Sequence, residues 1–359
     1  MTTLTTPLNE HLLAAGARRG EYRGVETARS FGNPTHEFGI LLRGCGLFDL
    51  GWRSKISITG KDRIRWMNGM ATNNIRDLPV DQGNYNFLLN AQGRIQGDLY
   101  VYNFGDHLLV DTEAWQTPTI LKLFKHYIIM DAVEVTDISE KLTALGLQGP
   151  QSREVLHRLG LNVPDDLRPQ HVLKLTWQNV GVSLIRMAGH LADGYEIWLS
   201  PSDASRLWDA LSAAGATPVG TDALEIFRVT AGIPRFGQDI RDRDLPQETG
   251  QMQALNFSKG CYLGQEIVER IRSRGNVHRQ LTGLLIEGEP PAPGTKLVVN
   301  GKDVGEITTA LKVPAAGAEK TLALGYIRKE AVRPDIIVQV NGSQAKLFNP
   351  PFREALLTG

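Results

Sequence analysis

The sequence predicts an α+β protein whose C-terminal part is a small β-barrel or β-sandwich. Residues 55–127 have the pattern of a strand, a helix, a hairpin and a helix, and a similar order recurs over residues 142–214. Residues 296–340 contain short strands separated by turns, which is typical of barrels and sandwiches. A chain of 359 residues is too long for one ordinary core and is expected to form two or three domains.

The composition is that of a globular protein, with 42% hydrophobic and 22% charged residues. The 39 basic residues balance the 39 acidic ones, and no basic run occurs, so we expect no nucleic-acid partner. No apolar run approaches the ~20 residues that cross a bilayer, and the N-terminus lacks the pattern of a signal peptide. We therefore expect no membrane partner and a cytoplasmic location.

The first elements follow from alternation and turn signals. Residues 55–58 alternate as a strand and end at Thr59-Gly60, and apolar positions at Ile64 and Met67 suit a helix. Two further strands, a third short strand and a helix that begins at Thr117-Pro118 follow. Their expected ranges are 85–89, 94–102, 108–110 and 117–127.

The central part repeats this kind of order and leads into the barrel. Expected strands cover 142–147, 172–177, 182–187 and 195–199, and expected helices cover 152–159, 202–214 and 221–231. The segment 288–294 is rich in Gly and Pro and cannot continue a helix or a central strand. The strands expected after it are 296–299, 304–308, 322–327 and 336–340.

The octapeptide KGCYLGQE, residues 259–266, carries one of two cysteines in the chain. The pattern predicts a helix that begins near Gly264, and a helix N-terminus favours an anion such as the Cys261 thiolate. Lys259 adds a positive charge two residues away, so Cys261 and Lys259 are candidate catalytic residues. The alternative is a structural cysteine in a tight turn, with Gln265 and Glu266 capping the helix.

A second candidate lies in the strand expected at residues 94–102. Alternation places Ile95, Leu99 and Val101 on one face, and Asp98 with Tyr100 on the other. A carboxylate flanked by aromatic rings can line a pocket, although a solvated strand face would have the same pattern. The two cysteines are too few for an iron–sulfur cluster, which usually takes about four. The side-chain spacing also predicts no metal site.

KGCYLGQE resembles the signature of the YgfZ family, which comprises folate-binding relatives of the glycine-cleavage T-protein linked to iron–sulfur cluster maintenance. Other segments resemble T-protein elements, and they are GLFDL (46–50), AGIP (231–234), GQD (237–239), VGEIT (304–308) and ALGY (323–326). The resemblance implies a T-protein-like three-domain cloverleaf around a folate channel, with two α+β domains and a C-terminal small β-barrel. The expected domains are 1–140, which binds folate, 141–280, which ends in KGCYLGQE, and the barrel 281–359.

The resemblance also implies site residues for tetrahydrofolate as cofactor. Glu196, in a Gly-Tyr-Glu sequence, matches the pterin anchor, because one carboxylate can accept two adjacent N–H donors. Asp98 matches the second residue of the family's Asp-Asp pair, and Gly97 replaces the first. At Val110-Asp111-Thr112 the T-protein pattern usually has an asparagine. Further cofactor-binding candidates are Tyr195, Tyr100, Gln265 and Arg228, with Arg235 and Arg270 as other cations for the folate tail.

Three functions remain open on these residues. The first is a YgfZ-like tetrahydrofolate-binding protein that supports iron–sulfur cluster assembly or repair, with Cys261 as functional thiol and iron–sulfur client or assembly proteins as partners. The second is a folate-dependent aminomethyltransferase or demethylase that uses Asp98, and the third is a non-catalytic scaffold.

Overall fold

The computed structural model describes all residues except 1–3, 190, 276, 316–317, 334–335 and 354–359. The chain divides into two compact units, and each is described by itself. Unit 1 contains residues 1–69, 74–86 and 99–224, and unit 2 contains residues 70–73, 87–98 and 225–359.

Unit 1 is built on three sheets. The strands β6 and β7 of one of these sheets continue into residues of unit 2. The strands are β1 (Leu4–Thr5), β2 (Arg18–Tyr22), β3 (Val25–Ser30), β4 (Gly46–Asp49), β5 (Arg53–Thr59), β6 (Gln82–Leu89), β7 (Ile95–Asn103), β8 (Leu108–Glu113), β9 (Glu134–Asp137), β10 (Thr143–Gln148), β11 (Val172–Trp177), β12 (Val180–Arg186), β13 (Gly194–Leu199) and β14 (Thr217–Pro218). The orders are β1-β3-β2, β11-β12-β13-β10-β4-β14 and β6-β7-β8-β5-β9.

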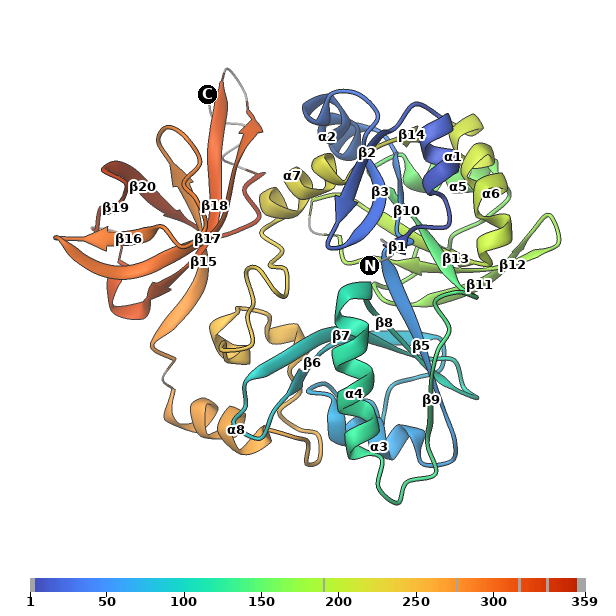
Figure 1. Ribbon diagram of the computed structural model, residues 1–359, viewed down its shortest axis with the longest axis horizontal. Coiled ribbons are helices and arrows are strands. Elements are labelled where there is room, and N and C mark those ends of the chain that lie inside the picture. The colour runs from blue at the N-terminus through green and yellow to red at the C-terminus, as the bar shows by residue number, and fades with distance from the viewer. Residues whose placement is uncertain (1–3, 190, 276, 316–317, 334–335, 354–359) are drawn as a thin grey trace. The chain divides into compact units, whose positions relative to one another are not determined.

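The helices of this region lie against the sheets (Figure 1). They are α1 (Asn9–Ala14), α2 (Pro34–Arg43), α3 (Arg63–Met70), the 3-10 helix η1 (Ala114–Gln116), α4 (Thr117–Tyr127), α5 (Ser152–Arg158), α6 (Pro201–Ala213) and α7 (Thr221–Ala231), the last of which continues from unit 1 into unit 2.

The six-stranded sheet buries one face under α5 and α6 (Figure 1). Alternate residues of β13, including Tyr195 and Ile197, join a core that contains Leu207 and Trp208 of α6. Because successive strand residues point to opposite faces, Glu196 and Trp198 lie on the other face.

In the five-stranded sheet, too, successive residues of a strand point to opposite faces. Ile56 and Ile58 of β5 are fully buried, and the helices α3 and α4 meet through an edge-to-face contact of Trp66 with Phe124, whose ring centroids are 5.2 Å apart. The opposite face of β5 carries Lys55, which lies beside the polar face of β7 and β8.

Unit 2 contains a closed six-stranded barrel in the order β15-β18-β17-β16-β19-β20 (orange and red in Figure 1). Its strands are β15 (Arg279–Ile286), β16 (Lys296–Val299), β17 (Lys302–Pro314), β18 (Glu319–Arg328), β19 (Val338–Val340) and β20 (Ser343–Phe348). The helices of this unit, apart from α7, are η2 (Pro246–Glu248), η3 (Met252–Ala254), α8 (Gln265–Arg274) and η4 (Lys329–Ala331).

The predicted α+β fold with a C-terminal barrel is confirmed. The sequence pattern did not identify the elements before residue 50, nor the strands β9, β14, β15 and β20. It also underestimated the length of β17, which continues through a register shift between Ile307 and Thr309. The three predicted domain ranges stay a prediction. Within the described residues, no helix is long and apolar enough to span a membrane.

Candidate functional site

A cluster of charged side chains lies between the two larger sheets of unit 1. The strand register aligns Tyr100 of β7, Asp111 of β8 and Lys55 of β5 in one row, because Asp111 pairs with both of the others. Glu196 and Trp198 project from β13 of the other sheet, and Lys55 bridges the sheets with its ammonium 4.7 Å from the centre of a Trp198 ring.

Asp111 is fully buried and receives two cations. Lys55 Nζ lies 2.6 Å from Asp111 Oδ1, and Arg53 donates from Nε and Nη2 to Oδ2 at 2.9 and 2.5 Å. Burial alone would raise the pKa of Asp111, but the charges of Arg53 and Lys55 outweigh it and hold that pKa below its usual value. Asp111 is therefore ionised at neutral pH.

Glu196 is only half-buried and differs from Asp111 in its partners. Its Oε2 accepts a hydrogen bond of 2.8 Å from Trp198 Nε1, and Oε1 accepts none among the residues that the structure describes. Burial and the nearby Asp111 carboxylate raise the pKa of Glu196, and Arg53 and Lys55 partly offset them. The carboxylate thus retains acceptor capacity for a ligand with N–H donors.

Trp198 and Tyr102 lie near this carboxylate and belong to a group of aromatic rings. Tyr100 lies between Tyr85 and Tyr102, with centroid separations of 5.1 and 6.3 Å, and Tyr102 packs edge-to-face on Trp198 at 4.9 Å. Tyr102 is buried, and its hydroxyl is satisfied there by donating to Gln170 Oε1 at 2.6 Å. The cluster therefore offers one open carboxylate beside flat apolar surfaces, which suits a planar heterocycle that carries donors.

The KGCYLGQE segment lies in unit 2 and packs against the turn between β6 and β7. Gly264 has φ +80°, and a Cβ there would come within 2.5 Å of the Asn90 carbonyl oxygen. A Cβ at Gly93 would come within 2.8 Å of Ile267. Both glycines are therefore required for the close approach of α8 to the turn.

Lys259 is buried, and its ammonium donates to the carbonyl oxygens of Ala71 and Asn73, each at 2.6 Å. Gln265 Oε1 accepts from the Tyr262 N–H at 3.3 Å, which is a capping contact at the start of α8. Both residues therefore stabilise the backbone of the segment, and their predicted roles in catalysis and cofactor binding stay predictions.

The two cysteines occupy opposite environments. Cys261 is exposed, three residues before the Gly264 cap of α8. Cys45 is buried, and burial raises the pKa of its thiol to about 11. The sulfur available to a reagent or partner is therefore that of Cys261.

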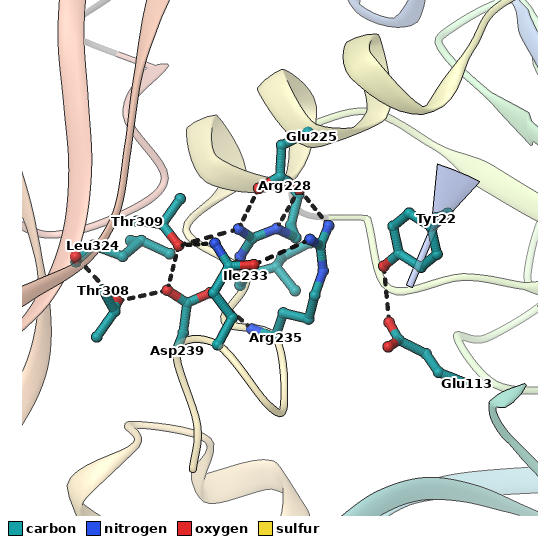
Figure 2. A network of polar contacts seen from close by, with 11 residues as sticks. Tyr22, Glu113, Glu225, Arg228, Ile233, Arg235, Asp239, Thr308, Thr309 and Leu324 are labelled. Atoms are coloured by element: carbon teal, nitrogen blue, oxygen red, sulfur yellow. Dashed lines mark hydrogen bonds and ion pairs between the residues drawn. The ribbon is translucent and has the colours of Figure 1, made fainter. Parts of the chain in front are cut away.

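Arg228 belongs to a buried network of unit 2 (Figure 2). Its guanidinium donates to Glu225, to Asp239 Oδ2 at 2.7 Å and to the Ile233 carbonyl at 2.6 Å. Asp239 also accepts from Thr308 and Thr309 of β17 at 2.6 and 2.7 Å. The network ties the AGIP and GQD segments to the barrel, so Arg228 stabilises this junction, and its predicted role in cofactor binding stays a prediction.

Comparison with known proteins agrees with the observed fold and identifies the family of the chain. Residues 8–259 match the GCVT N-terminal domain family. The chain belongs to this family. An aminomethyltransferase of Picosynechococcus sp. is 30% identical over 99% of both chains, and one of Herpetosiphon aurantiacus is 28% identical over 98% of both.

The fold of this GCVT-family chain is that of the T-protein. The crystal structure of glycine cleavage system aminomethyltransferase T from Bartonella henselae superposes with a TM-score of 0.87, at 21% identity, over 98% of this chain and 99% of that one. At this identity the likeness shows the fold alone. The predicted T-protein-like architecture is thereby confirmed.

The predicted site residues of the GCVT-family chain fall into both units. Glu196 and Tyr100 share the cluster of unit 1, whereas Tyr195 is buried in the core on the opposite face of β13. Asp98, half-buried on β7, lies in unit 2 with Arg228, Lys259, Cys261 and Gln265.

Sequence reasoning missed Arg53, Lys55 and Trp198, which complete the cluster. One signal for them was present, namely an aspartate at position 111 where the T-protein pattern usually has an asparagine. A carboxylate in a buried strand needs a cationic partner, and the neighbouring strand carries two cations at positions 53 and 55.

Proposed function

We propose that this chain is a YgfZ-type tetrahydrofolate-binding protein of the cytoplasm that supports the assembly or repair of iron–sulfur enzymes. The observation that carries the proposal is the half-buried Glu196, which has one oxygen held by Trp198 and the other without a hydrogen bond among the described residues. A pterin presents an N–H and an amino group side by side, and one carboxylate can accept both.

The residues present fit a folate at this carboxylate. Tyr100 supplies an aromatic surface beside it, and Arg53, which lies 5.9 Å from the Tyr100 ring centre, compensates the buried charge. When bound, tetrahydrofolate would supply one-carbon chemistry, and Glu196 would fix the orientation of its pterin. In this proposal Cys261 is the functional thiol, which its exposure supports.

The thiol is tested in cells that lack the protein and show a deficit of an iron–sulfur dehydratase. We expect the parent chain and Cys45→Ala to restore the dehydratase activity and Cys261→Ala to fail, at equal protein levels. Restoration by Cys261→Ala equal to that by the parent would show that KGCYLGQE acts only in the structure.

The second candidate is a folate-dependent aminomethyltransferase. The relatives named aminomethyltransferase favour it, as does Asp98, which would orient or deprotonate an amine. Gly97 in place of the first aspartate and the KGCYLGQE segment count against it. Formation of methylenetetrahydrofolate from an aminomethyl donor, abolished by Asp98→Asn, would establish this candidate over the first and over a non-catalytic scaffold.

A further inference from the structure

Lys55 is a buried cation whose ammonium has two neighbours in the described structure. The side chain has no exposed surface, and Nζ lies 2.6 Å from Asp111 Oδ1 and 4.7 Å from the centre of a Trp198 ring. An ammonium is costly to bury. A placement that satisfies it with one carboxylate and one aromatic face therefore fixes both groups relative to β5.

The contacts continue from Lys55 to the open carboxylate. Trp198 is 1% exposed, packs on Tyr102 and donates its N–H to Glu196 Oε2 at 2.8 Å. The indole cannot reorient without losing the Lys55 contact, the Tyr102 contact or this hydrogen bond. Lys55 thus acts on the orientation of Glu196 through Trp198.

Charge balance gives Lys55 a second effect on the same group. The groups that face Glu196 are Asp111 of β8, Arg53 and Lys55 of β5, Tyr102 of β7 and Trp198 of β13. With Glu196 ionised, Asp111 and Glu196 face the two cations, and Glu113 is a third carboxylate near Arg53. Removal of Lys55 would leave these three carboxylates with Arg53 alone, and like charges disfavour joint ionisation.

We propose that Lys55 is a positioning residue of the folate site, which holds the Trp198 indole and supplies the counter-charge that keeps the Glu196 carboxylate ionised and oriented for a ligand. The inference rests on the proposed function in taking Glu196 as the pterin anchor. The effect of Lys55 on Glu196 is, however, a property of the ligand-free chain and can be measured without folate.

The test is the titration of Glu196 in the ligand-free protein, followed by NMR of glutamate labelled with carbon-13 at the side-chain carboxyl and assigned with Glu196→Gln. We expect the titration midpoint of Glu196 to rise in Lys55→Met, because a facing cation is lost. The matched control is Lys174→Met. Lys174 of β11 likewise pairs with a carboxylate, that of Asp81 at 2.7 Å, and lies 5.1 Å from a Phe104 ring centre, but it is half exposed. The Lys174→Met substitution should leave the titration midpoint of Glu196 unchanged.

An unchanged Glu196 midpoint in Lys55→Met would overturn the inference. If Lys55→Met does not fold, Lys55→Gln decides, because it removes the charge and keeps a polar group beside Asp111. An unchanged Glu196 midpoint in Lys55→Gln would then overturn the inference, and a raised midpoint would support it.

Tetrahydrofolate binding of the same variants separates this inference from the proposed function. If the parent binds tetrahydrofolate and Lys55→Met binds it at least about tenfold more weakly near neutral pH, the proposed function and the inference about Lys55 both hold. If the parent does not bind, the proposed function fails, while the NMR titration still decides the role of Lys55.

Discussion

At the scale of single residues, some polar groups have all their hydrogen-bonding capacity used within the fold, whereas others remain available to a ligand or reagent. Asp111 and Asp239 are fully buried and accept several hydrogen bonds from cations and hydroxyls. Glu196 has one oxygen held by Trp198, and Cys261 is exposed. Function is expected where acceptor or nucleophilic capacity remains.

The two cysteines should differ sharply in reactivity. An alkylating reagent should modify Cys261 of the native protein rapidly, and Cys45 only on unfolding, because the Cys45 thiol is buried and its pKa is raised to about 11. Mass spectrometry of digests after timed alkylation measures both. Comparable modification rates at the two sites in the native protein would refute the assignment of Cys261 as the available thiol.

Glu225 should make the stability of unit 2 depend on pH. Burial alone would raise the pKa of Glu225, but Arg228 and Arg235 lower it from 4.5 to about 2 in the folded chain. The contribution of Glu225 to the free energy of unfolding is therefore fully present above pH 4.5 and is lost as the pH falls through 2. We expect Glu225→Gln to lower the free energy of unfolding by roughly 3 kcal/mol at pH 6.

The loss in Glu225→Gln should shrink between pH 4.5 and pH 2, because the protonated glutamate resembles glutamine in charge. Urea denaturation of parent and variant over this range measures the difference. A difference in unfolding free energy that is the same at pH 6 and pH 2.5 would mean that the ion pairs of Glu225 do not stabilise the fold.

At the scale of elements, helix α8 shows how the signature octapeptide is built into the fold. The helix begins after Gly264 and ends before Gly275, both in the left-handed region, at φ +80° and +71°. A Cβ at Gly264 would collide with the Asn90 carbonyl oxygen, whereas at Gly275 it would meet no atom within 4 Å. Close packing therefore constrains the N-terminal glycine more strongly.

Alanine at the two glycines should separate backbone strain from packing. Gly275→Ala should cost about 1 kcal/mol of unfolding free energy, which is the cost of a left-handed alanine. Gly264→Ala should cost about 3 kcal/mol or more, because the backbone of Asn90 must also shift. Equal losses in the two variants, measured by urea denaturation, would contradict the packing that we describe around KGCYLGQE.

At the scale of the whole molecule, local patterns predicted the elements that obey them. Alternation over β7 correctly placed Ile95, Leu99 and Val101 in the core, and the Thr117-Pro118 pair marked the start of α4. The short strands and turns predicted a small β-barrel or β-sandwich, and the structure has a closed barrel, although β15 and β20 were missed.

The site was less predictable, because its form depends on contacts between distant segments. Alternation places Lys55 opposite Ile56 and Ile58, on a face that would be solvated if the second sheet did not cover it. Trp198 and Asp111, which are 143 and 56 positions from Lys55 in the sequence, determine its environment. Glu196 and Tyr100 were named because of the family resemblance, and periodicity alone does not distinguish them from surface residues.

The central claim is that Glu196 anchors a folate, and a tetrahydrofolate titration followed by tryptophan fluorescence tests it most directly. Trp198, hydrogen-bonded to Glu196, is a reporter within the site. We predict saturable binding to the parent, weaker binding to Glu196→Gln by roughly tenfold or more, and unchanged binding to Glu134→Gln, which alters an exposed glutamate of β9. The absence of saturable binding to the parent, or equal affinity of parent and Glu196→Gln, would contradict the account.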